Sequence, residues 1–483
     1  MKIALISSPL DSQEKESISL FRVIHDASKM RLYWNRLFRK ILRPLYFLDF
    51  EDYPLNLVQL ATLLKEKHEV RIFNFLRKDL TCELFEFRPD VAGFNCSGGG
   101  NLVWIDKFSR KIKSELGSII LLGGSHPTLT PAESLKTTAA DYVFKGESDF
   151  TIKQTMDFIS GKRPSLPEDG LCYRKEGKII EGPLAVIKDL SSLPLPDHSL
   201  LDLEKYKSIN IEVSRGCGCN CSFCYISGYQ PAYPWRMRNP EAIIDEIKSI
   251  KKRVKNEKRF YFVDANFGFN LKLTKELLKK IINEKLNISF WTGMGINIDD
   301  EALDLMKQAG CSFFFTGIES GSRKHLDKMS KINSQQYVED FIKKLAQKGF
   351  SVTVSLVLML PEETRKELAQ TFDFCLRLSR IFKKHSESGE AKILFYPNIY
   401  RPVPATPDYH KLVKKGFVPP KTFREWGEFY NEISTGNFRR CNFTSDVTPL
   451  FLKKILLKFT LLNMATFFLP ALKTFGINFA KRS

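Results

Sequence analysis

Four cysteines fall within one eight-residue run, CGCNCSFC, which begins at Cys217. Three of them, Cys217, Cys221 and Cys224, have the spacing Cys-x3-Cys-x2-Cys. Three thiolates this close can hold three corners of a cubane iron–sulfur cluster and leave the fourth iron open for chemistry. Cys219 breaks this spacing if it replaces either neighbour, so we interpret it as a spare thiol. The run therefore predicts a [4Fe–4S] centre with one vacant iron site.

Two other interpretations of the cysteine run are less well supported. A structural zinc site takes four ligands, usually in two separated pairs, whereas these four cysteines crowd one loop and the sequence has no second Cys-x2-Cys. A disulfide or a pair of core thiols is disfavoured by the polar residues around them. Gly216, Gly218 and Asn220 supply the backbone freedom that a loop around a cluster needs.

The composition indicates a multidomain intracellular protein. A chain of 483 residues predicts two or three domains, and 43% hydrophobic residues are ample for their cores. Ten cysteines are too few for a disulfide scaffold, and the start, MKIALISSPL, has no secretory pattern. We therefore expect a reducing cytoplasm, where clustered cysteines more often bind metal.

The net charge of +19 calls for an anionic partner, which could be nucleic acid, a membrane or a substrate. Residues 29–43, KMRLYWNRLFRKILR, form a basic amphipathic helix pattern, and the segment from Pro449 repeats it. Such helices lie in membrane interfaces, although both could instead pack on the protein's own core. The longest charge-free run of this C-terminal segment, Phe459 to Leu472, is shorter than the roughly 20 residues of a membrane span. We expect peripheral contact with the inner face of the membrane. Nucleic acid is disfavoured because the basic residues alternate with large aliphatic ones and no RNA-binding module is recognisable.

Residues 1–160 alternate strand and helix patterns, which predicts a doubly wound α/β domain with a parallel sheet. Ligands bind such sheets at the carboxyl ends of the strands. Residues 8–53 form a long insertion that contains the basic helix. The strands are expected at Lys2–Ser7, Val70–Phe75, Asp90–Asn95, Ser118–Leu122 and Tyr142–Lys145, and the helices at Leu55–Lys67 and Leu102–Leu116.

The rest of the chain divides into a linker, a second α/β domain and a C-terminal region. Residues 161–205 are predicted to be a linker with a small hairpin, Gly170–Ile180 against Gly182–Ile187. Six strand–helix units over 206–400 predict a partial (β/α)6 barrel, whose site lies at the carboxyl ends of its strands. The cysteine run directly follows the first of these strands. Residues 401–483 are expected to be mostly helical.

The cysteine run resembles the signature of the radical S-adenosylmethionine (SAM) enzymes. Its last cysteine follows an aromatic residue, Phe223, as is usual in that family. Later segments resemble the family as well, although Glu362 stands where a glycine is usual. The matching segments are 214–224, 238–246, 262–267, 309–321 and 360–364.

The first half of the chain resembles the cobalamin-binding subfamily of radical SAM enzymes. The segments that carry this resemblance are 121–128, 141–147 and 189–196. The motif Asp-x-His-x-x-Gly is absent, so no lower axial histidine is predicted. His126 follows a Gly-Gly-Ser turn and is either a cobalamin contact or a residue that shapes the turn. Together the resemblances cover roughly residues 50–400.

The resemblance implies a chemistry and a set of site residues. Cys217, Cys221 and Cys224 would hold the cluster, which would cleave SAM to a 5′-deoxyadenosyl radical. Cobalamin would then supply a methyl group to an unactivated carbon of a lipid or natural product, with flavodoxin or ferredoxin as the reductant. The implied SAM contacts are Phe223, Tyr225, Asp264, Glu319, Ser320 and Ser355. The implied cobalamin contacts are Ser97, Gly98, Gly123, Gly124, His126, Thr128, Gly146 and Glu147.

Alternatives stay open at this point. Glu319 could instead cap the following helix, and Ser355 could simply line the barrel. The reaction could be cyclisation or carbon–carbon coupling without methyl transfer. An iron–sulfur electron-transfer protein is a hypothesis of a different class, but it would usually have a fourth cysteine ligand and no need for a barrel.

Overall fold

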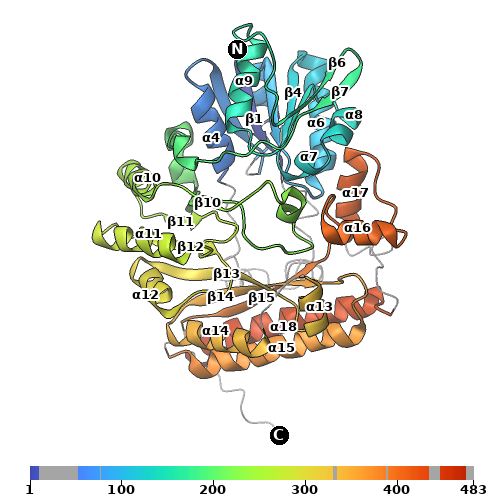
Figure 1. Ribbon diagram of the computed structural model, residues 1–483. Helices are drawn as coiled ribbons and strands as arrows, with labels where there is room; N and C mark the ends of the chain where they lie inside the picture. The colour runs from blue at the N-terminus through green and yellow to red at the C-terminus, as the bar shows by residue number, and fades with distance from the viewer. Residues whose placement is uncertain (10–52, 77, 330–333, 388–389, 435–445, 475–483) are drawn as a thin grey trace, which may run out of the picture.

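The computed structural model describes residues 1–9, 53–76, 78–329, 334–387, 390–434 and 446–474. Two α/β sheets lie one beyond the other, and C-terminal helices run beside both of them (Figure 1). This arrangement confirms the predicted fold class. The basic helix predicted over 29–43 lies outside the described residues.

The first sheet has the strand order β2-β1-β3-β4-β5-β6-β7, and its first five strands are parallel. Successive residues of β1 face opposite layers of helices, because Ile3 packs with α4 and α9 and Ala4 packs with α6. This two-sided burial is why β1 is apolar almost throughout. The strands are β1 (Lys2–Ser7), β2 (Glu69–Asn74), β3 (Val91–Asn95), β4 (Ile119–Gly123), β5 (Tyr142–Phe144), β6 (Leu171–Lys175) and β7 (Lys178–Glu181). The helices are α4 (Leu55–Leu64), α5 (Thr81–Phe87), α6 (Asn101–Leu116), α7 (Ser125–Leu129), α8 (Pro131–Thr137) and α9 (Asp149–Ile159).

The predicted hairpin forms, but its turn and its place differ from the expectation. The turn lies at Glu176 and Gly177, which both adopt positive φ (51° and 77°), as a tight two-residue hairpin turn requires. β6 then pairs antiparallel with β5. Residues 171–181, expected in a linker, therefore complete the first sheet.

The second sheet is parallel throughout, with the order β15-β14-β13-β12-β11-β8. Each strand except the last leads to helices on the outer face, as predicted for a partial barrel. The strands are β8 (Ser208–Ile211), β11 (Arg259–Phe262), β12 (Ser289–Gly293), β13 (Cys311–Glu319), β14 (Ser351–Leu358) and β15 (Ile393–Ile399). The helices are α10 (Pro240–Arg253), α11 (Leu271–Asn283), α12 (Asp300–Gln308), α13 (Arg323–Lys328), α14 (Gln335–Gln347) and α15 (Arg365–His385).

The C-terminal region is helical and joins the two sheets from the side. It comprises α16 (Pro407–Lys414), α17 (Phe423–Ser434) and α18 (Pro449–Thr474). α17 packs on α6 of the first domain so closely that a Cβ at Gly427 would lie 2.8 Å from the Val103 nitrogen. α18 packs along α15 and β15 (Figure 1). There the Asn463 side chain accepts a hydrogen bond from the Phe395 nitrogen and donates one to the Phe395 oxygen, at 2.8 Å each. These two bonds pair one residue of the open edge of the sheet.

Candidate active site

The cysteine run lies in a loop that begins and ends at one short antiparallel ribbon. This cluster loop, residues 216–235, connects β9 (Ser214–Arg215) to β10 (Arg236–Met237). Gly216 has a φ of 83°, and a Cβ there would overlap the carbonyl oxygen of Pro234. A Cβ at Gly218 would overlap the ring of Phe269. The path of the loop therefore requires glycine at position 216, whereas the exposed Phe269 ring can turn away from a side chain at position 218.

Cys219 is more exposed than the three cysteines predicted as ligands. Cys217, Cys221 and Cys224 are half-buried, whereas Cys219 is exposed and its sulfur lies 3.7 Å from the Asn266 amide nitrogen. Within the described ranges, no three His, Cys, Asp or Glu side chains converge on the position of a single metal ion. A cubane does not require such convergence, because each thiolate binds a different iron.

The cluster loop is held by both the C-terminal region and the first domain. The Ser222 hydroxyl donates to the Asp408 carboxylate at 2.8 Å, and the Asp408 nitrogen donates to the Ser222 oxygen at 3.1 Å. The Tyr229 hydroxyl donates to the Ser125 oxygen of α7 at 3.2 Å. Contacts to two separate parts of the chain fix the position of the loop.

Asp264, predicted as a SAM contact, fastens the start of the cluster loop. Its Oδ1 accepts from both the backbone nitrogen and the hydroxyl of Ser214 at 2.5 Å. Burial raises the pKa of this carboxyl to about 7, although the Ser214 hydrogen bonds oppose the shift. The Oδ1 atom of Asp264 is thus hydrogen-bonded to the β9–β10 ribbon.

The other predicted SAM contacts fall into two groups. Glu319 and Ser355 are on neighbouring strands: the Glu319 carboxylate lies back over Gly317, and the Ser355 hydroxyl accepts from Asn398 at 3.1 Å. Ser320 instead faces α15, where its hydroxyl lies 3.2 Å from that of Thr371 and accepts from the Ser322 nitrogen. Phe223 packs against a small apolar cluster, and Tyr225 is 44% exposed beside Tyr229. The geometry favours Glu319 and Ser355 over Ser320 as SAM contacts.

Strained backbone collects where the strands of the second sheet end. Glu319 is the last residue of β13, Met359 follows β14, and Ala405 lies in the loop after β15; their φ angles are 71°, 64° and 63°. Residues other than glycine rarely adopt a positive φ, and those that do gather at functional sites. Glu362, which replaces the usual glycine, keeps the turn by adopting φ of 67° and forms an ion pair with Lys415.

A cavity of about 380 Å³ opens between the two sheets. Its walls are the carboxyl ends of β3, β4 and β5, the Pro-rich strap at 193–196, and polar residues at the start of the second domain. Gly123, Gly124, Gly146 and Glu147, all predicted cobalamin contacts, line it. Both oxygens of Glu147 are already bonded to Arg236, so its carboxylate supports the wall.

The remaining predicted cobalamin contacts lie beside the cavity or turn away from it. Ser97 and Gly98 belong to the neighbouring loop, which Ser125 holds through the Ser97 oxygen at 2.6 Å. Thr128 bridges two loops by donating to the Gly124 oxygen and accepting from the Gly146 nitrogen. His126 is buried among the aromatic rings of α17, and burial lowers its pKa to about 3. This position favours the turn-shaping interpretation of His126.

Comparisons with known proteins agree with this geometry. The Radical SAM superfamily model matches residues 211–375, and the B12 binding domain model matches residues 48–154. An uncharacterized methyltransferase of Pyrococcus horikoshii is 30% identical over 340 residues, which are 67% of this chain and 73% of that protein. The chain belongs to the cobalamin-binding radical SAM family.

One further relative agrees with the assignment, and one solved structure shares the fold. The bacteriochlorophyllide d C-8(2)-methyltransferase of Chlorobaculum tepidum is 26% identical over 66% of each chain. The structure of the radical SAM methyltransferase TsrM from Kitasatospora setae, with cobalamin and a [4Fe–4S] cluster bound, has a TM-score of 0.64 at 16% identity and covers 86% of this chain and 75% of that one. The predictions of a radical SAM methyltransferase and of its three cofactors are confirmed. Such enzymes act on small molecules and need a reductant.

The chain's residues fit these cofactors. Three half-buried thiols on a loop that requires glycine at position 216 match the donors of a cluster with an open iron. The cavity walls combine glycines at strand ends with apolar side chains such as Leu121 and Phe144. Such walls suit the flat face of a ring-bearing cofactor such as cobalamin. No histidine is among the described residues that line this cavity, in agreement with the missing lower-ligand motif.

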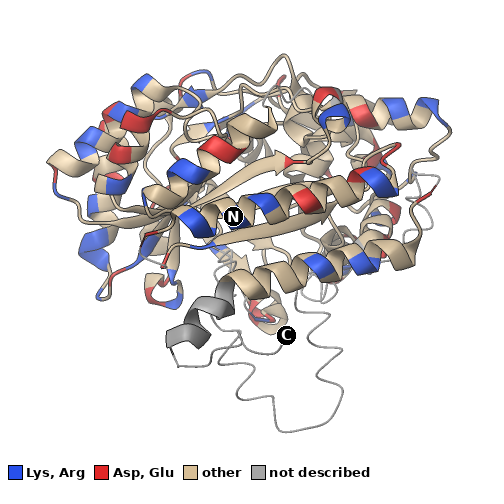
Figure 2. Ribbon diagram, turned by 90° about the horizontal axis from the view of Figure 1, so that it is seen from below, with Lys and Arg blue, Asp and Glu red and all other residues tan. Residues whose placement is uncertain are grey.

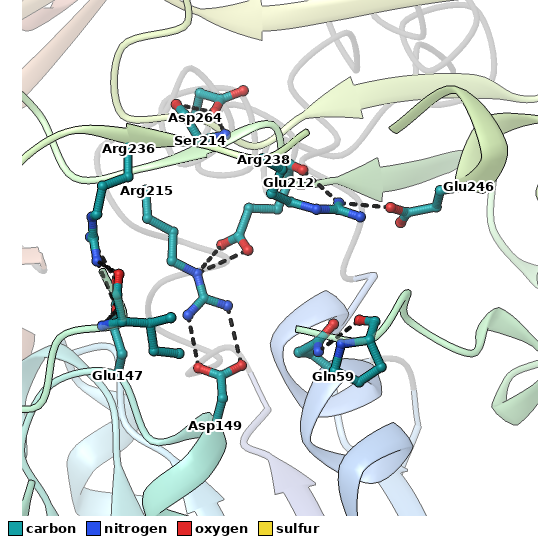
Figure 3. Close-up of polar contacts among 12 residues, drawn as sticks. Gln59, Glu147, Asp149, Glu212, Ser214, Arg215, Arg236, Arg238, Glu246 and Asp264 are labelled. Carbon is teal, nitrogen blue, oxygen red and sulfur yellow. Dashed lines mark hydrogen bonds and ion pairs between the residues drawn. The ribbon is translucent and has the colours of Figure 1, made fainter. Parts of the chain in front are cut away.

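Sequence reasoning missed how the arginines at the start of the second domain pair with carboxylates, two of them across the domains (Figure 3). Arg215 bonds Asp149 through both terminal nitrogens at 2.8 and 3.2 Å, and Arg236 bonds Glu147 through both at 2.9 Å. Arg238 forms an ion pair with Glu246 at 2.7 Å. Arg215 was visible beside the cysteine run, but its partner is 66 residues away in the sequence.

Proposed function

We propose that the enzyme transfers a methyl group from cobalamin to an unactivated carbon of an apolar lipid or natural product. When bound, the cluster and SAM supply the radical and cobalamin supplies the methyl group. An external one-electron donor such as flavodoxin or ferredoxin would serve as the reductant. The observation that carries the proposal is the inner face of the second sheet.

That inner face is an aromatic floor, formed by Tyr261, Trp291, Phe313, Phe315 and Tyr396. Their neighbours along the strands, such as Phe260 and Phe262, belong to the core beneath the helices, so the floor residues point to the opposite side. All five are half-buried rather than buried. Tyr261 stacks on Trp291 at 3.6 Å between ring centroids.

One strand of the aromatic floor, β11, ends beside the base of the cluster loop. β11 carries Tyr261, and three residues later Asp264 bonds Ser214 at the base of that loop. Half-buried aromatic rings favour apolar or ring-bearing ligands over strongly charged ones. The floor therefore supports an apolar substrate close to the site of radical formation.

Phe313→Ala tests this role of the aromatic floor. The reconstituted enzyme would be incubated with reductant, methyl-labelled SAM and either the organic or the aqueous fraction of a cell extract. We expect label in the organic fraction, and about a tenfold or greater loss in the variant, because a floor contact is lost. Formation of 5′-deoxyadenosine without substrate should stay unchanged. Phe85→Ala, a half-buried ring of the first domain, is the matched control. Label only in the aqueous fraction would contradict an apolar substrate.

The outward face of α18 supports peripheral membrane contact. No helix among the described residues has the length and hydrophobicity to cross a membrane. Leu452, Ile455, Phe459 and Leu462 anchor α18 in the core. On the other side Leu450, Leu457 and Leu461 are 64%, 42% and 56% exposed, and their spacing places them on one stripe.

Charge indicates what this leucine stripe contacts. Lys453, Lys454 and Lys458 are exposed beside it, and α18 contains no Asp or Glu. A second copy of the helix would bring lysines against lysines, whereas anionic lipid neutralises them. Figure 2 shows the molecule from below the view of Figure 1, with lysines and arginines in blue.

Replacing Leu450, Leu457 and Leu461 together with serine should abolish sedimentation with vesicles that contain phosphatidylglycerol, because buried leucine area drives insertion. Val418→Ser, at an exposed site on another surface, is the control. Equal sedimentation of the triple variant, or binding to neutral vesicles alone, would contradict membrane contact through α18.

A further inference from the structure

Two arginines bracket the cluster loop and grip the first domain. Arg215 is the last residue before the loop, and Arg236 is the first residue after it. Their partners, Asp149 and Glu147, lie two residues apart where β5 leads into α9. All four side chains are at most 12% exposed. These four residues, here called the double clamp, are drawn together in Figure 3.

The register of the ribbon places the two clamp arginines opposite each other, and the first domain supplies a carboxylate to each of them. Arg215 and Arg236 are directly opposite each other in the β9–β10 pair. Like charges in opposed positions of an antiparallel pair destabilise it. Here each guanidinium is neutralised by a two-pronged contact with a carboxylate, and both clamp carboxylates come from the first domain. The base of the cluster loop is therefore completed by the domain that binds cobalamin.

The surrounding contacts make each half of the double clamp rigid. Both oxygens of Glu212 accept from the Arg215 Nε at 2.9 Å, so that guanidinium is held on two sides. On the other half, Glu147 accepts from the Ile187 nitrogen at 2.6 Å while Arg236 donates to the Ile187 oxygen at 2.5 Å. Fork-shaped contacts of this kind fix orientation as well as distance.

We propose that the double clamp is a positioning device that sets the distance and angle between the iron–sulfur cluster and cobalamin. The double clamp lies at the base of the cluster loop, and Glu147, Asp149 and Arg215 belong to the wall of the cavity between the sheets. It therefore acts through the cluster loop and the β5–α9 loop. The inference rests on two of the family's cofactors, the iron–sulfur cluster and cobalamin, and is independent of the substrate proposed above.

Asp149→Asn is the first test. It removes one clamp charge, and Arg215 stays neutralised by Glu212, so the fold should tolerate it. The second variant, Glu147→Gln with Arg236→Gln, removes both charges of the other half together, which avoids an orphaned ion. Glu181→Gln, which breaks the Lys145 pair within the first sheet, is the matched control.

The readout is the magnetic dipolar coupling between the reduced cluster and cob(II)alamin in the reconstituted holoenzyme, measured by pulsed electron paramagnetic resonance. We expect one narrow distance in the parent and in the control. Both clamp variants should add a longer, broader distance population while keeping the parent's iron and cobalamin content. An unchanged distance distribution would overturn the proposal. Loss of cobalamin with the cluster intact would also overturn it, because the clamp would then be a binding site for cobalamin.

Discussion

Replacing any one of Cys217, Cys221 or Cys224 with alanine is expected to abolish the formation of 5′-deoxyadenosine from SAM. Each of the three predicted ligands would hold one iron, so the loss of a thiolate leaves that iron without its protein ligand and makes the cluster unstable. The effect should exceed the roughly 100-fold losses typical of residues that only support a metal ligand. Iron content, visible absorbance and 5′-deoxyadenosine are measured after anaerobic reconstitution.

Cys219→Ala is the control for this experiment. It changes a thiol of the same run, but one that is exposed and lies against Asn266. Its iron content and its yield of 5′-deoxyadenosine should stay within about twofold of the parent, since no iron depends on it. If Cys219→Ala lost the cluster and one of the other three variants kept it, the assignment of ligands would be wrong.

Gly124→Ala should remove cobalamin and leave the iron–sulfur cluster in place. Gly124 has a φ of 119°, and a Cβ there would overlap the Cys96 oxygen and lie 2.8 Å from the Cys96 carbonyl carbon. Backbone on both sides cannot move without separating the ends of β3 and β4 at the cavity wall. We expect the free energy of unfolding of the first domain to fall by several kcal/mol, which is about the sum of the costs of backbone strain and overpacking. The cobalamin-to-protein and iron-to-protein ratios measure the outcome.

Gly161→Ala separates conformational strain from the clash. Gly161 also has a positive φ, 73°, but no heavy atom lies within 4 Å of its added Cβ. This variant should cost about 1 kcal/mol and retain cobalamin. Equal loss of cobalamin in both variants would show that the close approach to Cys96 is not what shapes the site.

Local sequence signals were sufficient for many elements of the fold. Asn239 and Asp299 accept hydrogen bonds from the first turns of α10 and α12, so the starts of these helices are encoded by neighbouring residues. The three cysteines predicted as cluster ligands could be proposed from spacing alone, since they lie within a run of eight residues. The parallel sheets followed from alternating strand and helix patterns.

Other features depend on partners that no local pattern names. The place of the β6–β7 hairpin was missed because a hairpin's turn chemistry does not say which strand it joins. His126 was ambiguous because Phe423 and Trp426, the rings that bury it, come from a helix almost 300 residues later.

The sequence by itself therefore determined the kind of chemistry: the family, its cofactors and the α/β fold class. Only the tertiary structure decided which charges pair across the domains, which aromatic residues share one face and which helix keeps an exposed leucine stripe. The physical reason is range. Hydrogen bonds within a turn and thiols within a loop are encoded by neighbours in the chain. The pairing of Arg215 with Asp149, or of Asn463 with the edge of β15, exists only once distant segments have docked.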